Sequence, residues 1–239
     1  MDVSTVARAD RIDSLVVDHW AAMAESDPAH KVKLVVDEWG AWHGASPDMP
    51  PNYLWAYPGS LRDALVAALT LDTFNRHADK IAMANVAQLV NTIHSLFLAR
   101  EDRFIATPNF HVFAMYAAHQ GGQSVRAVLS SPSIAMPRAA RAQTLWGLAG
   151  SASRRDRELV VTIVNPHATD PRPCAISVHG GSVRSARATV LTSTDLRAHN
   201  SFDQPNALVP REATVNVASG SIHHTFPAAS VTRLDVELG

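Results

Sequence analysis

The sequence predicts an α/β segment followed by an all-β segment. In the first half of the 239 residues, apolar positions at helical spacing alternate with short apolar runs, the pattern of an α/β fold. Beyond Gly121-Gly122 the pattern changes to period-two segments separated by turn residues. Charge changes at the same place: residues 1–120 hold 14 acidic and 9 basic residues, whereas residues 121–239 hold 8 acidic and 12 basic residues. We therefore expect two domains, 1–120 and 121–239.

Composition excludes several classes of function. A hydrophobic content of 46% with 18% charged residues is ordinary for a soluble globular protein. The net charge of −1 gives no reason to expect nucleic acid or an anionic membrane as a partner. Cys174 is the only cysteine, which excludes an internal disulfide and a cysteine-rich zinc site. Neither a signal-peptide pattern nor a long uncharged run is present, so a cytoplasmic location is expected.

The first half begins with a helix, a strand and a long loop. Apolar residues at helical spacing predict a helix over residues 11–26. Residues 31–36 read as a strand, and its β-branched end without alternation predicts burial on both faces. Asp37 and Glu38 follow at the exit of this strand, since burying a carboxylate inside it would be costly. The proline-rich loop over residues 44–59 is long enough to suggest a functional role.

A second helix and a second strand repeat this pattern. The spacing predicts a helix over residues 60–76, with Ser60 and Asp63 as its capping box. Residues 81–84 read as a short strand, followed by a loop. Thr107-Pro108 then begins a third helix, with threonine as the N-cap and proline at the first helical position.

The second half predicts a β-sandwich or jelly-roll, because short strands follow one another without helices. The expected strands are residues 125–129, 159–164, 175–178, 188–191, 213–217, 222–226 and 231–236. The segment His179-Gly180-Gly181-Ser182 is typical of a tight hairpin turn.

Ordered motifs along the chain resemble those of the glycoside hydrolase family 51 α-L-arabinofuranosidases. They are Val36-Asp37-Glu38-Trp39-Gly40, Leu61-Arg62-Asp63-Ala64-Leu65, His77-Ala78-Asp79, the run from Met83 to Asn91, Thr107-Pro108 with His111-Val112-Phe113, and the run from Phe226 to Val231. The resemblance covers nearly the whole chain. It implies the C-terminal part of a (β/α)₈ TIM barrel, strands seven and eight, followed by an antiparallel β-sandwich or jelly-roll domain.

The resemblance also assigns candidate site residues. It implies that Glu38 is the catalytic nucleophile of a retaining enzyme, that Gln88 hydrogen-bonds the bound arabinofuranose, and that Trp42 lies beside the cleaved sugar, without a metal or an organic cofactor. The residues alone also allow Asp37 and Glu38 to be a plain strand end, Trp42 to be a core residue and Gln88 to satisfy loop backbone groups. The 12 histidines are scattered, which favours structural or surface roles over a metal site.

One carboxylate of the expected pair is missing. A retaining glycosidase needs a second carboxyl group about 5–5.5 Å from the nucleophile, as proton donor. In the family this glutamate follows an asparagine, and the sequence contains no Asn-Glu dipeptide. With two recognisable barrel strands, the chain resembles a C-terminal portion lacking the first six strands. It is then a fragment of an arabinofuranosidase, an inactive remnant, or one half of a split enzyme that needs a separate N-terminal half.

The resemblance implies arabinose-containing oligosaccharides and polysaccharides as substrates, and a homo-oligomer, commonly a hexamer, for the full-length family. A separate carbohydrate-binding role for residues 121–239 is disfavoured, because their expected strands carry no row of solvent-facing aromatic residues.

Overall fold

The computed structural model describes residues 6, 8–42, 58–136, 143–145 and 147–239. Most of the proline-rich loop that the sequence marked as functional therefore lies outside the described residues. The helical elements are α2 (Arg11–Met23), α3 (Leu61–Arg76), α4 (Pro108–Tyr116) and the 3₁₀ turn η1 (Ala117–His119). Within the described part, no helix is both long and apolar enough to cross a bilayer.

The strands of the first half form two separate pairs: β1 (Leu34–Trp39) with β2 (Ile81–Val86), and β3 (Phe97–Arg100) with β4 (Arg103–Ala106). The β1–β2 pair is parallel, as expected for neighbouring strands of a barrel. The antiparallel β3–β4 hairpin occupies a segment that the sequence reading treated as loop. That reading missed it because the reversal uses Glu101 at a positive φ of 56° instead of glycine or asparagine.

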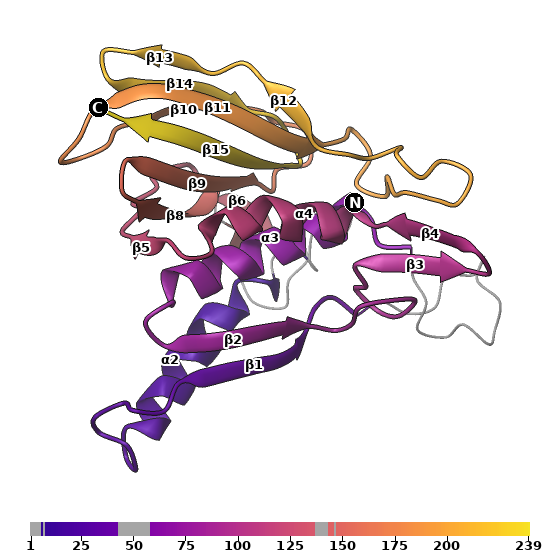
Figure 1. The fold of residues 1–239 in the computed structure, drawn as a ribbon, viewed down its shortest axis with the longest axis horizontal. Helices are drawn as coiled ribbons and strands as arrows, with labels where there is room; N and C mark the ends of the chain where they lie inside the picture. The colour runs from indigo at the N-terminus through magenta and orange to yellow at the C-terminus, as the bar shows by residue number, and fades with distance from the viewer. Residues whose placement is uncertain (1–5, 7, 43–57, 137–142, 146) are drawn as a thin grey trace.

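Antiparallel sheets make up the second half (Figure 1). A six-stranded sheet has the order β12-β11-β15-β9-β8-β5, a three-stranded sheet has the order β10-β14-β13, and β6 pairs with β7. The bounds are β5 (Gln123–Val125), β6 (Ile134–Met136), β7 (Gln143–Leu145), β8 (Ala149–Arg155), β9 (Glu158–Asn165), β10 (Arg172–Ile176), β11 (Val183–Thr192), β12 (Arg211–Ala213), β13 (Asn216–Ala218), β14 (Ser221–Phe226) and β15 (Ser230–Leu238). Buried residues of the two larger sheets, among them Leu159, Leu234 and Phe226, share one core, so the expected sandwich is confirmed.

Four expectations about the strands of the second half were wrong. The strand expected over residues 125–129 is absent apart from its first residue, because β5 spans Gln123–Val125. The Gly180-Gly181 turn joins β10 to β11, which belong to different sheets, so it is a crossover and not a hairpin. The single strand expected over residues 213–217 is split between β12 and β13. Strand β8 was missed because its sequence, Ala-Gly-Ser-Ala-Ser-Arg-Arg, lacks β-branched and aromatic residues.

The strand around Val35 also differs from expectation. It starts later, at Leu34, and runs on to Trp39, so that Asp37 and Glu38 belong to the strand. Val35 is 53% exposed, which contradicts the expected burial on both faces. Val36 packs against the main core, whereas Val35, on the opposite face, leaves about half of its surface open to solvent. Met83 of β2 is similarly exposed, at 55%.

Helix α3 lies between the β1–β2 pair and the six-stranded sheet (Figure 1). Its capping box is as expected, because Asp63 accepts hydrogen bonds from both the backbone N–H and the hydroxyl of Ser60. Of its 16 residues, 12 are buried, so the helix is covered on nearly every side.

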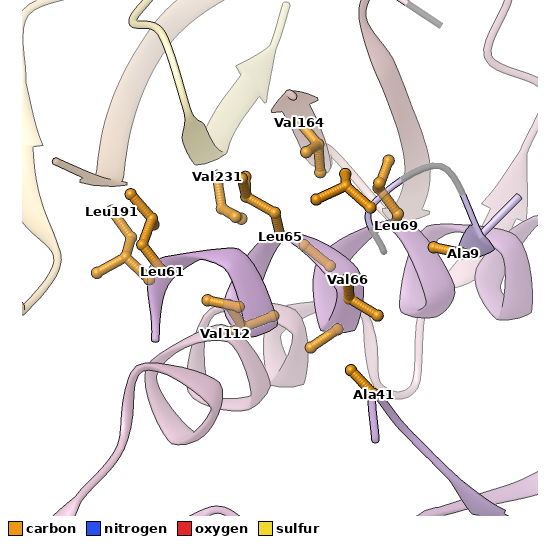
Figure 2. Packing of buried hydrophobic residues seen from close by; sticks show 14 of the residues in the cluster. Ala9, Ala41, Leu61, Leu65, Val66, Leu69, Val112, Val164, Leu191 and Val231 are labelled. Carbon is orange, nitrogen blue, oxygen red and sulfur yellow. The ribbon is translucent and has the colours of Figure 1, made fainter. Parts of the chain in front are cut away.

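The apolar side chains of α3 point in two directions (Figure 2). Leu61, Leu65 and Leu69, spaced four residues apart, lie toward Leu191, Val231 and Val164 of the six-stranded sheet. Val112 of α4 and Ala41 after β1 lie on the other side. The two halves of the chain thus share one apolar core through this helix.

A buried polar network also joins α3 to the sheet. Asp72 accepts hydrogen bonds from the hydroxyls of Ser151 at 2.7 Å and Thr162 at 2.6 Å. His119 of η1 lies 3.1 Å from the Thr162 hydroxyl through Nε2 and 2.7 Å from the Ser153 hydroxyl through Nδ1. Burial raises the pKa of the Asp72 carboxyl to about 6, although these hydroxyls act to lower it. Burial lowers the pKa of His119 to about 4.

Replacing Asp72 by asparagine should change how stability depends on pH. Because the pKa of Asp72 is raised from 3.8 to about 6 on folding, the folded protein holds a proton on this carboxyl more tightly than the unfolded chain does. The stability gained from this proton is complete below about pH 4 and is lost as the pH rises through about 6. Relative to D72N, we expect the wild-type free energy of unfolding to fall by about 3 kcal/mol from below pH 4 to above pH 6. Urea unfolding of both proteins at a series of pH values measures this difference.

His119 does not obscure that comparison, because its lowered pKa destabilises both proteins as the pH falls from 6.5 through about 4. Asp203→Asn, a change at a side chain 90% exposed, is the matched control and should leave the profile unchanged. A stability difference between wild type and D72N that is the same at every pH would contradict the ionisation assigned to Asp72.

Candidate active site

Glu38 lies in a bulge at the carboxyl end of β1. The pairs Val36–Ala84 and Trp39–Val86 are in register, and between them Asp37 and Glu38 of β1 face one residue, Asn85, of β2. The extra residue takes a positive φ, 53° at Glu38. A bulge of this kind changes the direction of a side chain at the end of a strand, and bulges are frequent beside active sites.

Each acid of the bulge receives a side-chain amide from the neighbouring segment. Gln88 Nε2 donates a hydrogen bond to Glu38 Oε1 at 3.1 Å. Asn85 Nδ2 donates to Asp37 Oδ1. The structure therefore brings together Glu38 and Gln88, two residues 50 positions apart that the sequence resemblance placed in one site. The Asp37–Asn85 pair was not anticipated, although the parallel register of β1 and β2 contains the signal for it.

Trp39, the residue after Glu38, is buried against α3 and α4. It is 6% exposed, stacks on Phe113 of α4 at 5.7 Å between ring centroids, and meets the edge of Phe74 of α3 at 5.3 Å. Trp39 is therefore a packing residue beside the site. Since Trp39 follows Glu38 directly, its packing fixes the backbone on one side of the carboxylate.

Gly40 leaves room for a second buried ring beneath the site. Its φ is +156°, and a Cβ atom built there would lie 2.9 Å from the Cβ of His94. His94 is 3% exposed and lies 6.0 Å from Trp39 between ring centroids. Trp39 thus fills space with its ring, and Gly40 leaves space because it has no side chain. Together they let the end of β1 lie against His94 in the loop that follows β2.

Trp42 is the third candidate site residue, and its side chain is exposed. It follows β1 and is 61% exposed, which excludes a core role. Asp37, Glu38, Asn85 and Gln88 are also exposed, so the described part of the site is an open surface. No group of three metal-ligating side chains occurs among the described residues. One carboxylate with an amide donor can receive a sugar hydroxyl or attack a carbon, but it needs a proton donor to complete a glycosidase.

Comparison with known proteins identifies the family. A family model described as the α-L-arabinofuranosidase C-terminal domain matches residues 37–230. The chain belongs to this family. The matched segment begins at Asp37, in the bulge that carries Glu38, and ends at the start of β15.

Curated relatives match most of this chain but are about twice as long. The chain is similar to an intracellular exo-α-L-arabinofuranosidase of Bacteroides ovatus, with 28% identity over 235 residues that make up 98% of this chain and 45% of that protein. It is also similar to an intracellular exo-α-(1→5)-L-arabinofuranosidase of Bacillus subtilis, with 26% identity over 213 residues, 85% of this chain and 42% of that protein. The chain thus spans about half the length of the curated relatives it matches.

Solved structures agree in fold. The GH51 arabinofuranosidase of Xanthomonas axonopodis pv. citri superposes with a TM-score of 0.91 and 31% identity, over 99% of this chain and 48% of that chain. The α-L-arabinofuranosidase of Thermotoga maritima superposes with a TM-score of 0.83 at 23% identity, over 98% of this chain and 49% of that chain, and shows the fold. The chain corresponds to a C-terminal portion of the GH51 arabinofuranosidases, as its sequence motifs indicated.

Adding a methyl group at Gly40 should disturb the family site more than a glycine substitution elsewhere. Gly40→Ala places a Cβ atom against His94, so we expect a cost of about 1–3 kcal/mol from crowding in addition to backbone strain. Gly180→Ala is the matched control, because Gly180 also has a positive φ, +83°, but has nothing within 4 Å of its built Cβ. Chemical unfolding of both variants measures the difference. Equal losses of stability would contradict the crowding at Gly40.

Proposed function

We propose that Glu38 is the nucleophile of a retaining α-L-arabinofuranosidase and that this chain supplies one half of the active site. The observation that carries the proposal is the contact of Glu38 with Gln88 at the carboxyl ends of two parallel strands, the end of a barrel where catalytic groups lie. The substrates are terminal, non-reducing α-L-arabinofuranosyl groups of arabinan, arabinoxylan and their oligosaccharides. Neither a metal nor an organic cofactor takes part.

The residues have separate roles in this proposal. Glu38 attacks the anomeric carbon, and water later hydrolyses the glycosyl-enzyme intermediate. Gln88 holds the attacking carboxylate through its amide and hydrogen-bonds a hydroxyl of the bound arabinofuranose. Asn85 holds Asp37 and so keeps the bulge in place. Trp42 offers an exposed aromatic face beside the cleaved sugar.

The complementary half supplies the proton donor. Among the described residues, β1 and β2 pair with each other and with no third strand, and both expose an apolar side chain, Val35 and Met83. Open strand edges and exposed apolar side chains favour association with further strands. We therefore assign residues 1–120 to a partial barrel and residues 121–239 to the sandwich, with turnover requiring the complementary N-terminal half of the barrel.

Location and assembly follow from the same relationship. Relatives that carry the word intracellular in their names support a cytoplasmic enzyme. The completed enzyme is proposed to be a homo-oligomer, a hexamer. Sedimentation of the completed enzyme tests the assembly, and a monomer at working concentration would contradict it.

Joining this chain to the N-terminal part of the Xanthomonas enzyme tests the role of Glu38. We expect the purified chain alone to leave an aryl α-L-arabinofuranoside unhydrolysed and the fusion to hydrolyse it. Glu38→Gln in the fusion should lower turnover by several orders of magnitude with little change in stability, because the amide keeps the shape and loses the nucleophile. Glu25→Gln, at an exposed acid outside the site, is the control.

Each outcome decides a separate part of the proposal. Near-normal turnover of the E38Q fusion would contradict the assignment of the nucleophile. Hydrolysis by the purified chain well above background would contradict the half-site. A folded fusion without turnover would instead indicate an inactive remnant.

A further inference from the structure

The β3–β4 hairpin has two different faces. In its register Ala99 lies opposite Phe104, and Phe97 lies opposite Ala106, so the two phenylalanines share one face. The other face carries Ile105, which is 8% exposed, together with Arg100 and Arg103. One face therefore carries the buried Ile105 and two exposed arginines, and the other is aromatic.

On the aromatic face, the exposed ring of Phe104 packs on a second ring. Phe104 is 60% exposed, yet its ring stacks on Phe97 with 4.8 Å between centroids and 30° between planes. Phe97 in turn lies 4.9 Å from Phe110 of α4. Phe104 thus packs on Phe97, which is itself held by Phe110, while much of the Phe104 ring faces solvent. An aromatic ring that is held in place and faces solvent can pack against a ligand without first being ordered.

Hydrogen bonds tie the hairpin to the segment that carries Gln88. Gln88 N donates to Ile93 O at 3.0 Å, and Phe97 N donates to Leu89 O at 3.0 Å. The Asn91 side chain donates to the carbonyl of Ala99 and accepts from its N–H, both at 2.7 Å. The position of the aromatic face is therefore coupled to that of the Glu38–Gln88 pair, beyond the carboxyl ends of β1 and β2 (Figure 1).

The loop between β11 and β12 braces the hairpin on its other side. Arg100 and Arg103 lie over the ring of Phe202, at 4.7 Å and 5.0 Å from its centroid. Asn200 Nδ2 donates to Ala106 O at 3.0 Å. Both guanidinium groups thus belong to the face opposite Phe104, and the aromatic face itself bears no charge.

We propose that Phe104, supported by Phe97, is a binding platform for sugar units of the glycan next to the arabinofuranosyl group held at Glu38 and Gln88. This proposal rests on the proposed function. A neutral sugar presents a face of C–H groups that packs on an aromatic ring, and an uncharged, pre-ordered ring suits such a ligand. The connection through the Gln88 segment places this platform beyond the carboxyl ends of β1 and β2, the end at which Glu38 and Gln88 lie.

Binding measurements on the full chain test the platform independently of turnover. The probes are methyl α-L-arabinofuranoside and linear α-(1→5)-arabinotetraose, titrated by NMR. We expect the wild type to bind the tetrasaccharide more tightly, and Phe104→Ala to weaken that binding about 3- to 10-fold, the effect of losing one ring contact. Phe104→Ala should leave the affinity for the monosaccharide unchanged, and Phe104→Tyr should retain tetrasaccharide binding.

Two controls separate the platform from folding and from the proposed site. Val128→Ala removes an apolar side chain outside the hairpin that is even more exposed, at 79%, and should change neither affinity. Gln88→Ala should weaken the binding of both ligands. If it weakens neither, the proposed site fails, and the platform beside that site fails with it.

The remaining outcomes would overturn the platform. If Phe104→Ala leaves the tetrasaccharide affinity unchanged, or if the wild type binds both probes equally, the platform is overturned and the proposed function is not affected. A wild type that binds neither probe also overturns the platform, whereas the proposed function is decided separately by the turnover of the fusion. A Phe104→Ala variant that changes the oligomeric state without changing tetrasaccharide affinity would assign Phe104 to a subunit contact.

Discussion

The burial of α3 on nearly every side is the constraint on which the rest of the structure depends. One side of the helix packs through leucines spaced four residues apart on the six-stranded sheet, and the other faces α4 and the end of β1. A helix of this kind cannot be stable alone, because its apolar circumference would face water. The sandwich therefore stabilises the helix, and the helix supports β1 and β2. Asp72 adds a polar contact that holds the two halves in one relative position.

The placement of Glu38 follows from that packing. Trp39 packs between Phe74 of α3 and Phe113 of α4, so the strand is anchored at the residue that follows the acid. The bulge then allows Glu38 to leave the regular register and meet the Gln88 amide. Glu38 and Gln88 thus lie on an exposed edge, while Trp39, one position after Glu38, is buried. This division explains how an open, incomplete site retains a defined geometry.

The sequence predicted those features that rest on local chemistry. The capping box of Ser60 and Asp63, the helix after Thr107 and most sandwich strands were found, because each has a short signal. Strand β8 was missed because its small residues reflect packing against α3, and the Asp37–Asn85 contact because it depends on tertiary register. Glu38 and Gln88 were named from family motifs, and periodicity alone could not have paired residues 50 positions apart.

The account depends most on the contact between Glu38 and Gln88 in the folded chain. NMR spectra of the chain labelled with ¹⁵N show the side-chain amide of Gln88 as a pair of signals, which Gln88→Ala assigns by removing them. If the contact exists in solution, Glu38→Gln shifts this pair, whereas the exposed-acid variant Glu25→Gln leaves it in place. A Gln88 side-chain signal that is identical in wild type and Glu38→Gln would contradict the account, because the carboxylate and the amide would then not share a site.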